Sequence, residues 1–279
     1  MQTITPSQLL ILKSLARYKF LTISLLDALQ IFKNKVSIYR AIAPLKDGKR
    51  PLVIAHSFGL HPSKGQLESL LYLTKYGKNL LIESGIDEAK IQIPVNKTLV
   101  STDYFHKVST IATFVHMDIF LKSTSNHTIF YHYYFDKAKK EPNVRFRQAK
   151  NHIKLDHGKF LIPDAVTKFQ YSQEKYLYLI EIHNGKDTNK ILTQVINHIH
   201  AIKLGTTKEK YNHTSSNRVA IIFEYQSCME ALIKKMNDEP KLNKYLNLFI
   251  FNTIENMKSN FNENWLLFDS TDTKFIKAI

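Results

Sequence analysis

Two carboxylates and a histidine come together through the pattern of residues 159–169 and 176–183. Both stretches are rich in β-branched and aromatic residues and are separated by a short polar turn, which predicts a β-hairpin. Asp164 lies in the first predicted strand, just after a proline, and Glu181 and His183 lie near the end of the second. Both carboxylates can therefore reach one edge of a sheet. This suits Mg²⁺, which binds one or two protein carboxylates and completes its octahedron with water and substrate phosphate.

The order Pro-Asp followed by Glu-x-His resembles the metal site of the PD-(D/E)xK nuclease superfamily, with His183 at the position usually held by lysine. His183 is two residues beyond Glu181 and so points to the same face of the strand. The resemblance implies that Asp164 and Glu181 bind Mg²⁺ or Mn²⁺, which polarises the scissile phosphate and helps to activate water. His183 is expected to bind the metal, orient water or position a phosphate. The alternative to a metal site is that Asp164 and Glu181 are a turn residue and an exposed charge at the end of a strand.

The composition indicates a folded protein with a polyanionic partner. The chain has 279 residues, of which 44% are hydrophobic and 23% charged, so it can bury a core. Thirty-nine Lys and Arg residues against 24 Asp and Glu give a net charge of +15, which favours nucleic acid or an acidic membrane surface as partner. The chain shows no predicted membrane span or signal peptide, and Cys228 is its one cysteine. We therefore expect a cytoplasmic protein that binds nucleic acid and not a membrane.

Residues 1–87 are predicted to form a winged-helix domain. Thr5 and Thr22 are suitable caps for the first two helices, and a third helix containing YRAIAPLKDG ends at Gly48. Two strands, 51–58 and 67–74, follow with a polar loop between them. In this fold the third helix enters the DNA major groove and the hairpin is the wing.

Basic and hydrogen-bonding side chains occur where such a domain would meet DNA. They are of the types that contact phosphates, so we expect DNA binding. The alternative is a protein-binding winged helix with an ordinary solvated basic face. The candidates are Lys33, Lys35, Ser37, Tyr39 and Arg40 around the third helix, Lys49, Arg50 and Lys64 around the wing, and Arg145 and Arg147 in a later basic stretch.

Residues 88–279 are predicted to form an α/β (α+β) domain with a mixed sheet, like the core of restriction endonucleases. A helix is followed by three strands, and then helices and strands alternate. Asp164 and Glu181 fall on the second and third strands. The predicted helices are 101–123, 187–204 and 226–236, and the predicted strands are 129–135, 159–169, 176–183, 218–224, 246–252 and 265–268.

The chain as a whole resembles the replication-relaxation family, which includes the MOB-C class of plasmid relaxases. The matching stretches are ITPSQLLILKSL, YRAIAPLKDGK, LYLTKYGKNLL, the helix that contains His116, and IPDAVTKF with LIEIHNGKD. The resemblance implies a winged helix joined to a nuclease-like domain, and a divalent metal that supports nicking of one DNA strand at a plasmid origin. It also implies that Asp164 and Glu181 are metal ligands and that His116 is an accessory site residue.

Two departures from the family keep other functions open. The position after Glu-x is often acidic in the family and is His183 here. A basic residue that is usual on the following helix is not clearly matched, and Lys190 and Gln194 are the nearest candidates. The main hypothesis is a relaxase-like DNA endonuclease in plasmid mobilisation, conjugation or DNA replication. Its partner is double-stranded or locally single-stranded DNA, with accessory mobilisation proteins. The alternatives are a non-catalytic DNA-binding replication protein with a degenerate nuclease fold, and a transcriptional repressor that needs no metal.

The remaining histidines do not predict a second metal site. His198 and His200 are two residues apart on a predicted helix, where their side chains point in different directions. His152 and His157 have no convincing metal-ligand spacing either.

Overall fold

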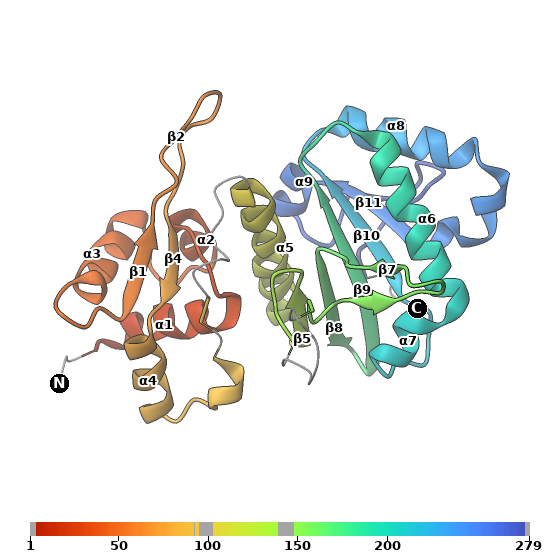
Figure 1. The fold of residues 1–279 in the computed structure, drawn as a ribbon. Coiled ribbons are helices and arrows are strands. Elements are labelled where there is room, and N and C mark those ends of the chain that lie inside the picture. The colour runs from red at the N-terminus through yellow and green to blue at the C-terminus, as the bar shows by residue number, and fades with distance from the viewer. Residues whose placement is uncertain (1–3, 92, 95–102, 139–147, 277–279) are drawn as a thin grey trace. The chain divides into compact units, whose positions relative to one another are not determined.

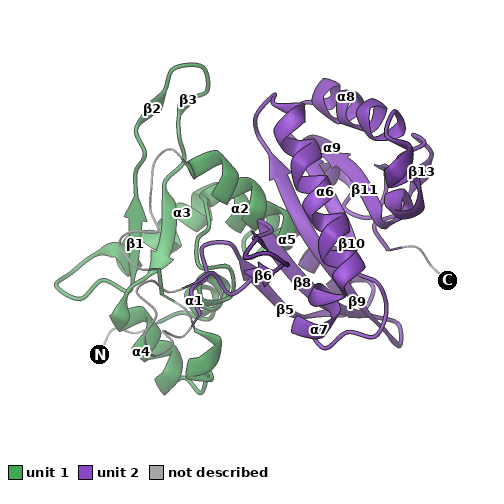
Figure 2. Ribbon diagram, turned by 45° about the vertical axis from the view of Figure 1, so that its right-hand side comes forward, with its two compact units in different colours: residues 1–115 green, residues 116–279 purple. Residues whose placement is uncertain are grey.

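The structure is a computed structural model that describes residues 4–91, 93–94, 103–138 and 148–276. It is a mixed α/β fold, which confirms the predicted class (Figure 1). The chain divides into two compact units, residues 1–115 and 116–279 (Figure 2). No helix in the described part of the chain combines the length and the apolar character needed to cross a membrane.

Unit 1 has the predicted order of three helices followed by a hairpin. Strands β1 and β4 pair antiparallel, and β2 and β3 extend the hairpin to its tip. Leu21 adds a single bridge to Leu71 of β4. The elements are α1 (Pro6–Tyr18), α2 (Ile23–Ala28), α3 (Lys35–Lys46), β1 (Val53–His56), β2 (Leu60–His61), β3 (Gly65–Gln66), β4 (Leu70–Leu73), α4 (Lys75–Glu83) and the 3₁₀ helix η1 (Glu88–Lys90).

The helices of unit 1 begin where side chains can cap them. Thr5 and Gln8 form a capping box at α1, and the Thr22 hydroxyl accepts a hydrogen bond from the N–H of Leu25. Asn34 caps α3 in the same way, through the N–H of Ser37. A capped helix start satisfies N–H groups that would otherwise lack partners. The caps therefore fix where these helices begin, while the burial of Ile38, Ile42 and Leu45 sets which face of α3 points outward.

The boundary between the units lies later than predicted. The sequence predicts it after residue 87, whereas the units meet at residue 115, inside helix α5 (Tyr104–Ser123). The start of α5 belongs to unit 1 because the Tyr104 hydroxyl donates to the carbonyl of Glu68, and the Phe105 ring lies 5.0 Å from that of His61. These aromatic contacts join distant parts of the chain and have no local sequence signal.

Unit 2 is built on a sheet that has seven strands in the described residues, in the order β13-β12-β11-β10-β9-β8-β5. The central strands β9, β10 and β11 are parallel, and the flanking pairs are antiparallel. The elements are β5 (His127–Tyr133), β6 (Ile153–Lys154), β7 (Phe160–Leu161), β8 (Ala165–Tyr171), β9 (Glu174–His183), α6 (Thr188–Leu204), α7 (Thr206–Lys210), β10 (Arg218–Phe223), α8 (Gln226–Asn237), the 3₁₀ helix η4 (Pro240–Leu248), β11 (Phe249–Thr253), α9 (Ile254–Ser259), β12 (Trp265–Leu266) and β13 (Asp272–Thr273).

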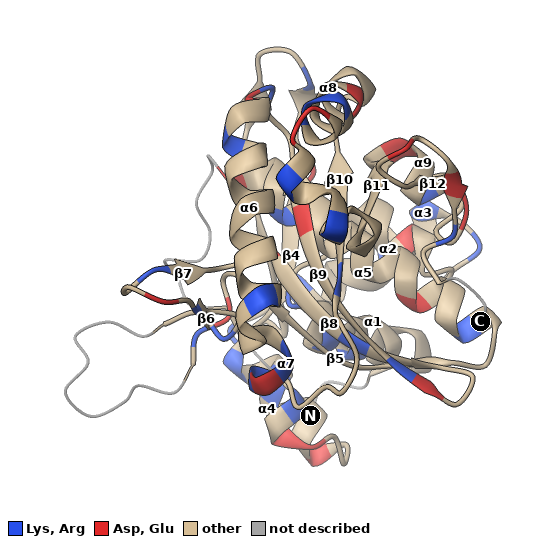
Figure 3. Cartoon of the chain, turned by 90° about the vertical axis from the view of Figure 1, so that its right-hand side faces the viewer, with Lys and Arg blue, Asp and Glu red and all other residues tan. Residues whose placement is uncertain are grey.

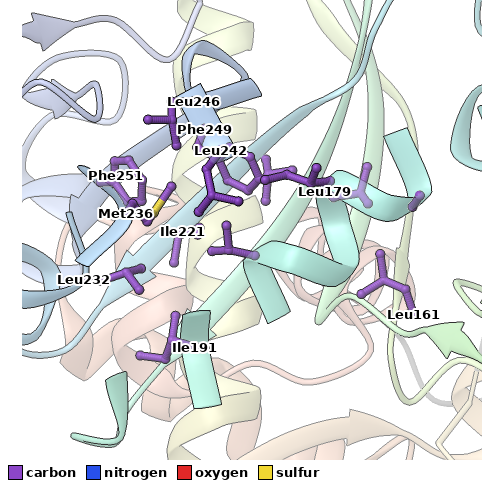
Figure 4. Close-up of a cluster of buried hydrophobic side chains, with 14 of the residues drawn as sticks. Leu161, Leu179, Ile191, Ile221, Leu232, Met236, Leu242, Leu246, Phe249 and Phe251 are labelled. Carbon is purple, nitrogen blue, oxygen red and sulfur yellow. The ribbon is translucent and has the colours of Figure 1, made fainter. Parts of the chain in front are cut away.

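The core of unit 2 lies between the sheet and the crossover helices α6 and α8 (Figure 4). Leu179 of β9 and Ile221 of β10 point into it, as does Ile191 of α6. The opposite face of the sheet carries aromatic residues, where Phe120 of α5 stacks on Tyr171 with ring centroids 6.2 Å apart. Side chains alternate between the two faces along a strand, so residues with the same parity as Leu179 face α6.

Three predicted strands of unit 2 differ from the observed ones. The strand predicted over 159–169 is interrupted before β8 by Pro163, which lacks an N–H to donate. Part of the strand predicted over 246–252 lies in η4, so that β11 begins at Phe249. The predicted edge strand 265–268 is shorter and is not an edge, because β13 pairs with it.

Candidate functional site

Asp164 and Glu181 lie side by side at one end of the β8–β9 pair. Ala165 pairs with Ile180 in the antiparallel register, so the next residues outward along this register are Asp164 and Glu181. Asp164 Oδ2 accepts a hydrogen bond of 2.7 Å from the backbone N–H of Ile182. The sequence prediction that the hairpin brings the two carboxylates together is therefore confirmed. The backbone bond holds Asp164 in place without using Glu181.

Glu181 is buried and contacts a histidine of the crossover helix. His198 Nε2 of α6 lies 2.6 Å from Glu181 Oε1, and both side chains are 1% exposed. The sequence analysis did not connect these residues, which are 17 positions apart. A partial signal is present, since His198 falls on the same helix face as Ile191 and Val195, which pack on the sheet. That periodicity predicts that His198 is buried, but not which strand residue it meets.

Burial and charge change the proton affinity of both groups. Burial, followed by the charge of the neighbouring Asp164, raises the pKa of Glu181 well above its usual value. Burial lowers the pKa of His198 to about 3, an effect that Asp164 opposes and His183 reinforces. The His198 imidazole is therefore neutral at pH 7, and the ionised form of Glu181 is disfavoured. A nearby cation would lower the pKa of Glu181 again, because it favours the charged carboxylate.

The carboxylate oxygens of Asp164 and Glu181 are suitable ligands for a divalent cation. Glu181 Oε2 is buried and has no hydrogen-bond partner within the described residues. Buried oxygens are usually hydrogen-bonded, and an unsatisfied one costs about 1–3 kcal/mol. Mg²⁺ or Mn²⁺ would satisfy this oxygen and relieve the repulsion from Asp164. Among the described side chains, no group of three or more His, Cys, Asp or Glu is arranged to hold a metal. A cation here would thus have two protein carboxylates, with water or phosphate completing its shell.

Two other predicted site residues, His183 and Lys190, lie at the end of β9 and at the start of α6. His183 is half-buried at the end of β9, with its ring centroid 5.5 Å from that of Phe223, and its role as a third ligand stays a prediction. Lys190 is exposed on the first turn of α6, and its backbone N–H donates to the Asp187 cap. Eight residues separate it from His198, which is about 12 Å along a helix axis.

His116 is not brought to the two carboxylates. It lies on α5 one helical turn before Phe120, which stacks on Tyr171 on the face of the sheet away from α6. Burial, followed by the positive charge of Lys258, lowers the pKa of His116. The helix therefore directs this histidine to the opposite side of the sheet from Glu181.

A polar rim lies beyond the carboxylates, where β9 and β10 end. Asn184 Nδ2 donates to Glu224 Oε2 at 3.1 Å, and Lys186 Nζ lies 5.2 Å from the ring centroid of Tyr225. The sequence analysis did not single out Asn184 or Glu224. Their proximity follows from the parallel register, in which Phe223 pairs with His183. Lysine residues also recur along α6, α7 and α8 (Figure 3).

Most of the described DNA-contact candidates of unit 1 lie on α3 or in the segments before and after it. Tyr39 is 59% exposed, and Arg40 beside it is exposed as well. Lys35 Nζ donates to the Ser24 hydroxyl, and Ser37 is half-buried in the first turn. The remaining candidates are Lys33 before α3, Lys49 and Arg50 between α3 and β1, Lys64 in the β2–β3 turn, and Arg145 and Arg147, which lie outside the described residues.

Comparisons with protein families, with curated proteins and with solved structures gave no match to this chain.

Proposed function

We propose that this protein is a metal-dependent DNA endonuclease that nicks a phosphodiester bond at the Asp164–Glu181 pair. The observation that carries the proposal is the buried, unpartnered Oε2 of Glu181 beside a second carboxylate. Two adjacent carboxylates in a low-dielectric position are costly when both are charged, and a divalent cation offsets that cost. A phosphate can complete the coordination shell of the same cation, which links the pair to phosphodiester chemistry.

Each side chain has a defined task in this reaction. Asp164 and Glu181 would hold Mg²⁺ or Mn²⁺, which supplies Lewis-acid stabilisation of the charge that develops on the phosphate. The backbone bond from Ile182 orients Asp164. His183, two residues beyond Glu181, orients the attacking water or a phosphate oxygen in the position usually held by lysine. Lys190 is exposed on the first turn of α6 and contributes positive charge toward the phosphate backbone.

Unit 1 would deliver the DNA. Its order of three helices and a hairpin is that of a winged helix, and α3 presents Tyr39 and Arg40 to solvent. The net charge of +15 supports a polyanionic partner. With the resemblance to the replication-relaxation family, we propose plasmid DNA as substrate, a relaxase-like role in mobilisation or replication in the cytoplasm, and accessory mobilisation proteins as further partners.

A second candidate is a non-catalytic DNA-binding protein with a degenerate nuclease unit, acting in replication or as a repressor. The observation that favours it is the contact of Glu181 with His198, because both side chains are 1% exposed. A divalent cation can bind a carboxylate that is buried in this way only if it displaces the proton from that carboxylate. The histidine at position 183, where the superfamily usually has lysine, also favours the non-catalytic candidate.

Nicking of supercoiled plasmid distinguishes the two candidates. The full chain is incubated with the DNA and Mg²⁺, Mn²⁺ or EDTA, and open circles are measured beside DNA binding. Asp164→Asn and Glu181→Gln keep the shape of each side chain but remove its charge. Glu174→Gln is the matched control, because Glu174 is an exposed carboxylate at the other end of β9.

The endonuclease predicts metal-dependent nicking by the wild type and by Glu174→Gln. It also predicts a loss of about 100-fold or more in the two site variants, which should still bind DNA. Salt-sensitive DNA binding without nicking in any metal would reject the endonuclease and leave the binding protein.

A further inference from the structure

Packing, and not only the contact with Glu181, fixes the position of His198. The residue lies on the buried face of α6 between Val195 and Ile199, whose side chains belong to the apolar core. Its ring meets that of Phe249 edge-on, with the centroids 6.5 Å apart and an interplanar angle of 84°. The imidazole has little freedom to turn, so Nε2 presents its hydrogen bond in one direction.

Because of this orientation, the two carboxylate oxygens of Glu181 have different surroundings. Oε1 lies 2.6 Å from His198 Nε2, while Oε2 has no hydrogen-bond partner within the described residues. Asp164, the neighbour of Glu181 in the hairpin register, is anchored separately by the N–H of Ile182. Each carboxylate is therefore held by a group that belongs to the protein, and one oxygen of Glu181 is left over.

We propose that His198 is a positioning residue that holds Glu181 through Oε1, so that Oε2 is the oxygen offered to a divalent cation shared with Asp164. This inference rests on the proposed metal-dependent function. The required tautomer has its hydrogen on Nε2 and a bare Nδ1. His198 Nδ1 is buried without a partner in the described residues, and an unpaired acceptor is tolerated more often than an unpaired N–H.

Two amide variants separate this role from simple core packing. The side-chain nitrogen of glutamine in His198→Gln can occupy the place of Nε2 and donate to Oε1, whereas asparagine in His198→Asn is too short. Both replacements are neutral and polar, so both disturb the apolar core. His198→Met is the second negative variant, since methionine has nearly the length of glutamine but no N–H. His200→Gln on the same helix is the control, because His200 contacts Asp156 instead.

The measurement is Mn²⁺ affinity of the full-length protein, followed by the electron paramagnetic resonance signal of free Mn²⁺, with thermal unfolding in EDTA recorded beside it. Loss of a group that orients a ligand typically weakens metal binding about 10–100-fold. We expect that loss in His198→Asn and His198→Met. His198→Gln and His200→Gln should stay within about threefold of the wild type, on the same scale.

Equal Mn²⁺ affinity in the Gln, Asn and Met variants would overturn the positioning role, whatever their unfolding temperatures. If His198→Asn does not fold, the comparison of Gln with Met decides. Wild-type binding that is lost in Glu181→Gln but unchanged in His198→Met would overturn this inference and leave the proposed metal site intact. A wild-type protein that binds no Mn²⁺ would overturn both.

Discussion

The carboxylate of Asp164 accepts a hydrogen bond from the backbone N–H of Ile182, with 2.7 Å between the two atoms. Ile182 follows Glu181, so this bond attaches the start of one strand to the end of its neighbour and keeps the two acidic side chains together. The proximity is built into the hairpin and does not require a bound ion. The resulting repulsion is one of the causes that raise the pKa of Glu181.

Glu181→Gln should stabilise the metal-free protein at neutral pH. The pKa of Glu181 is raised in the folded state, so its stabilising protonated form is complete below the ordinary pKa of 4.5 and is lost as the pH rises. Glutamine keeps the neutral form at every pH. Its advantage should grow by ~1.4 kcal/mol for each pH unit between the unfolded and folded pKa values. Urea unfolding in EDTA at several pH values measures this difference.

The gain should be absent below pH 4.5 and in Glu174→Gln, whose carboxylate is exposed. A wild type that is more stable than Glu181→Gln at pH 7 in EDTA would contradict the assignment of a strained carboxylate pair.

His198 should make the protein less stable as the pH falls from 6.5 toward 3. Burial lowers its folded pKa to about 3, so the unfolded chain takes up a proton in this range that the folded protein does not. The cost is ~1.4 kcal/mol per pH unit. Glu181 opposes it above pH 4.5, so the direct comparison is between wild type and His198→Gln. As the pH falls from 6.5 to 4.5, urea unfolding should show the stability of His198→Gln increasing relative to that of the wild type.

His157→Gln is the control for the loss of a histidine, since the side chain of His157 is 87% exposed. Identical acid slopes for wild type and His198→Gln would show that His198 is protonated in the folded protein.

Gly77→Ala should strongly destabilise unit 1. A Cβ at this position of α4 would meet the backbone carbonyl of Leu52 and touch the Leu73 side chain. The backbone must move to relieve this, and overpacking of this kind costs about 1–3 kcal/mol or more. Gly185→Ala is the matched control, because no atom lies within 4 Å of its added Cβ and its φ is not positive. Thermal unfolding should distinguish the two variants, and equal melting temperatures would show that α4 can shift away from β1.

Arg40→Ala should weaken DNA binding and reduce its salt dependence. Arg40 is exposed on α3 beside Tyr39, where a winged helix faces the DNA. Each phosphate contact contributes about 0.9 to the slope of log affinity against log salt concentration. Fluorescence anisotropy with duplex DNA at several salt concentrations measures that slope. Lys13→Ala, which removes the same charge from an exposed position of α1, should leave it unchanged. Equal slopes for the two variants would remove α3 from the DNA interface.

Much of the local structure could be predicted because it depends on neighbouring residues. The capping threonines Thr5 and Thr22 and the apolar periodicity of α6 marked helices at the observed places. The hairpin of β8 and β9 was predicted as well, and with it the meeting of Asp164 and Glu181. The predicted start of the 159–169 strand is wrong, because Pro163 separates β7 from β8.

The sequence by itself determined the α/β class, the basic charge and the pairing of Asp164 with Glu181, because periodicity, composition and a short turn act over a few residues. Only the tertiary structure decided that His198 contacts Glu181, that His116 lies on the other side of the sheet, and that unit 1 extends into α5. These contacts depend on how each helix is rotated against the sheet or hairpin it covers. That rotation is set by side-chain packing between segments far apart in the chain, which no local pattern records.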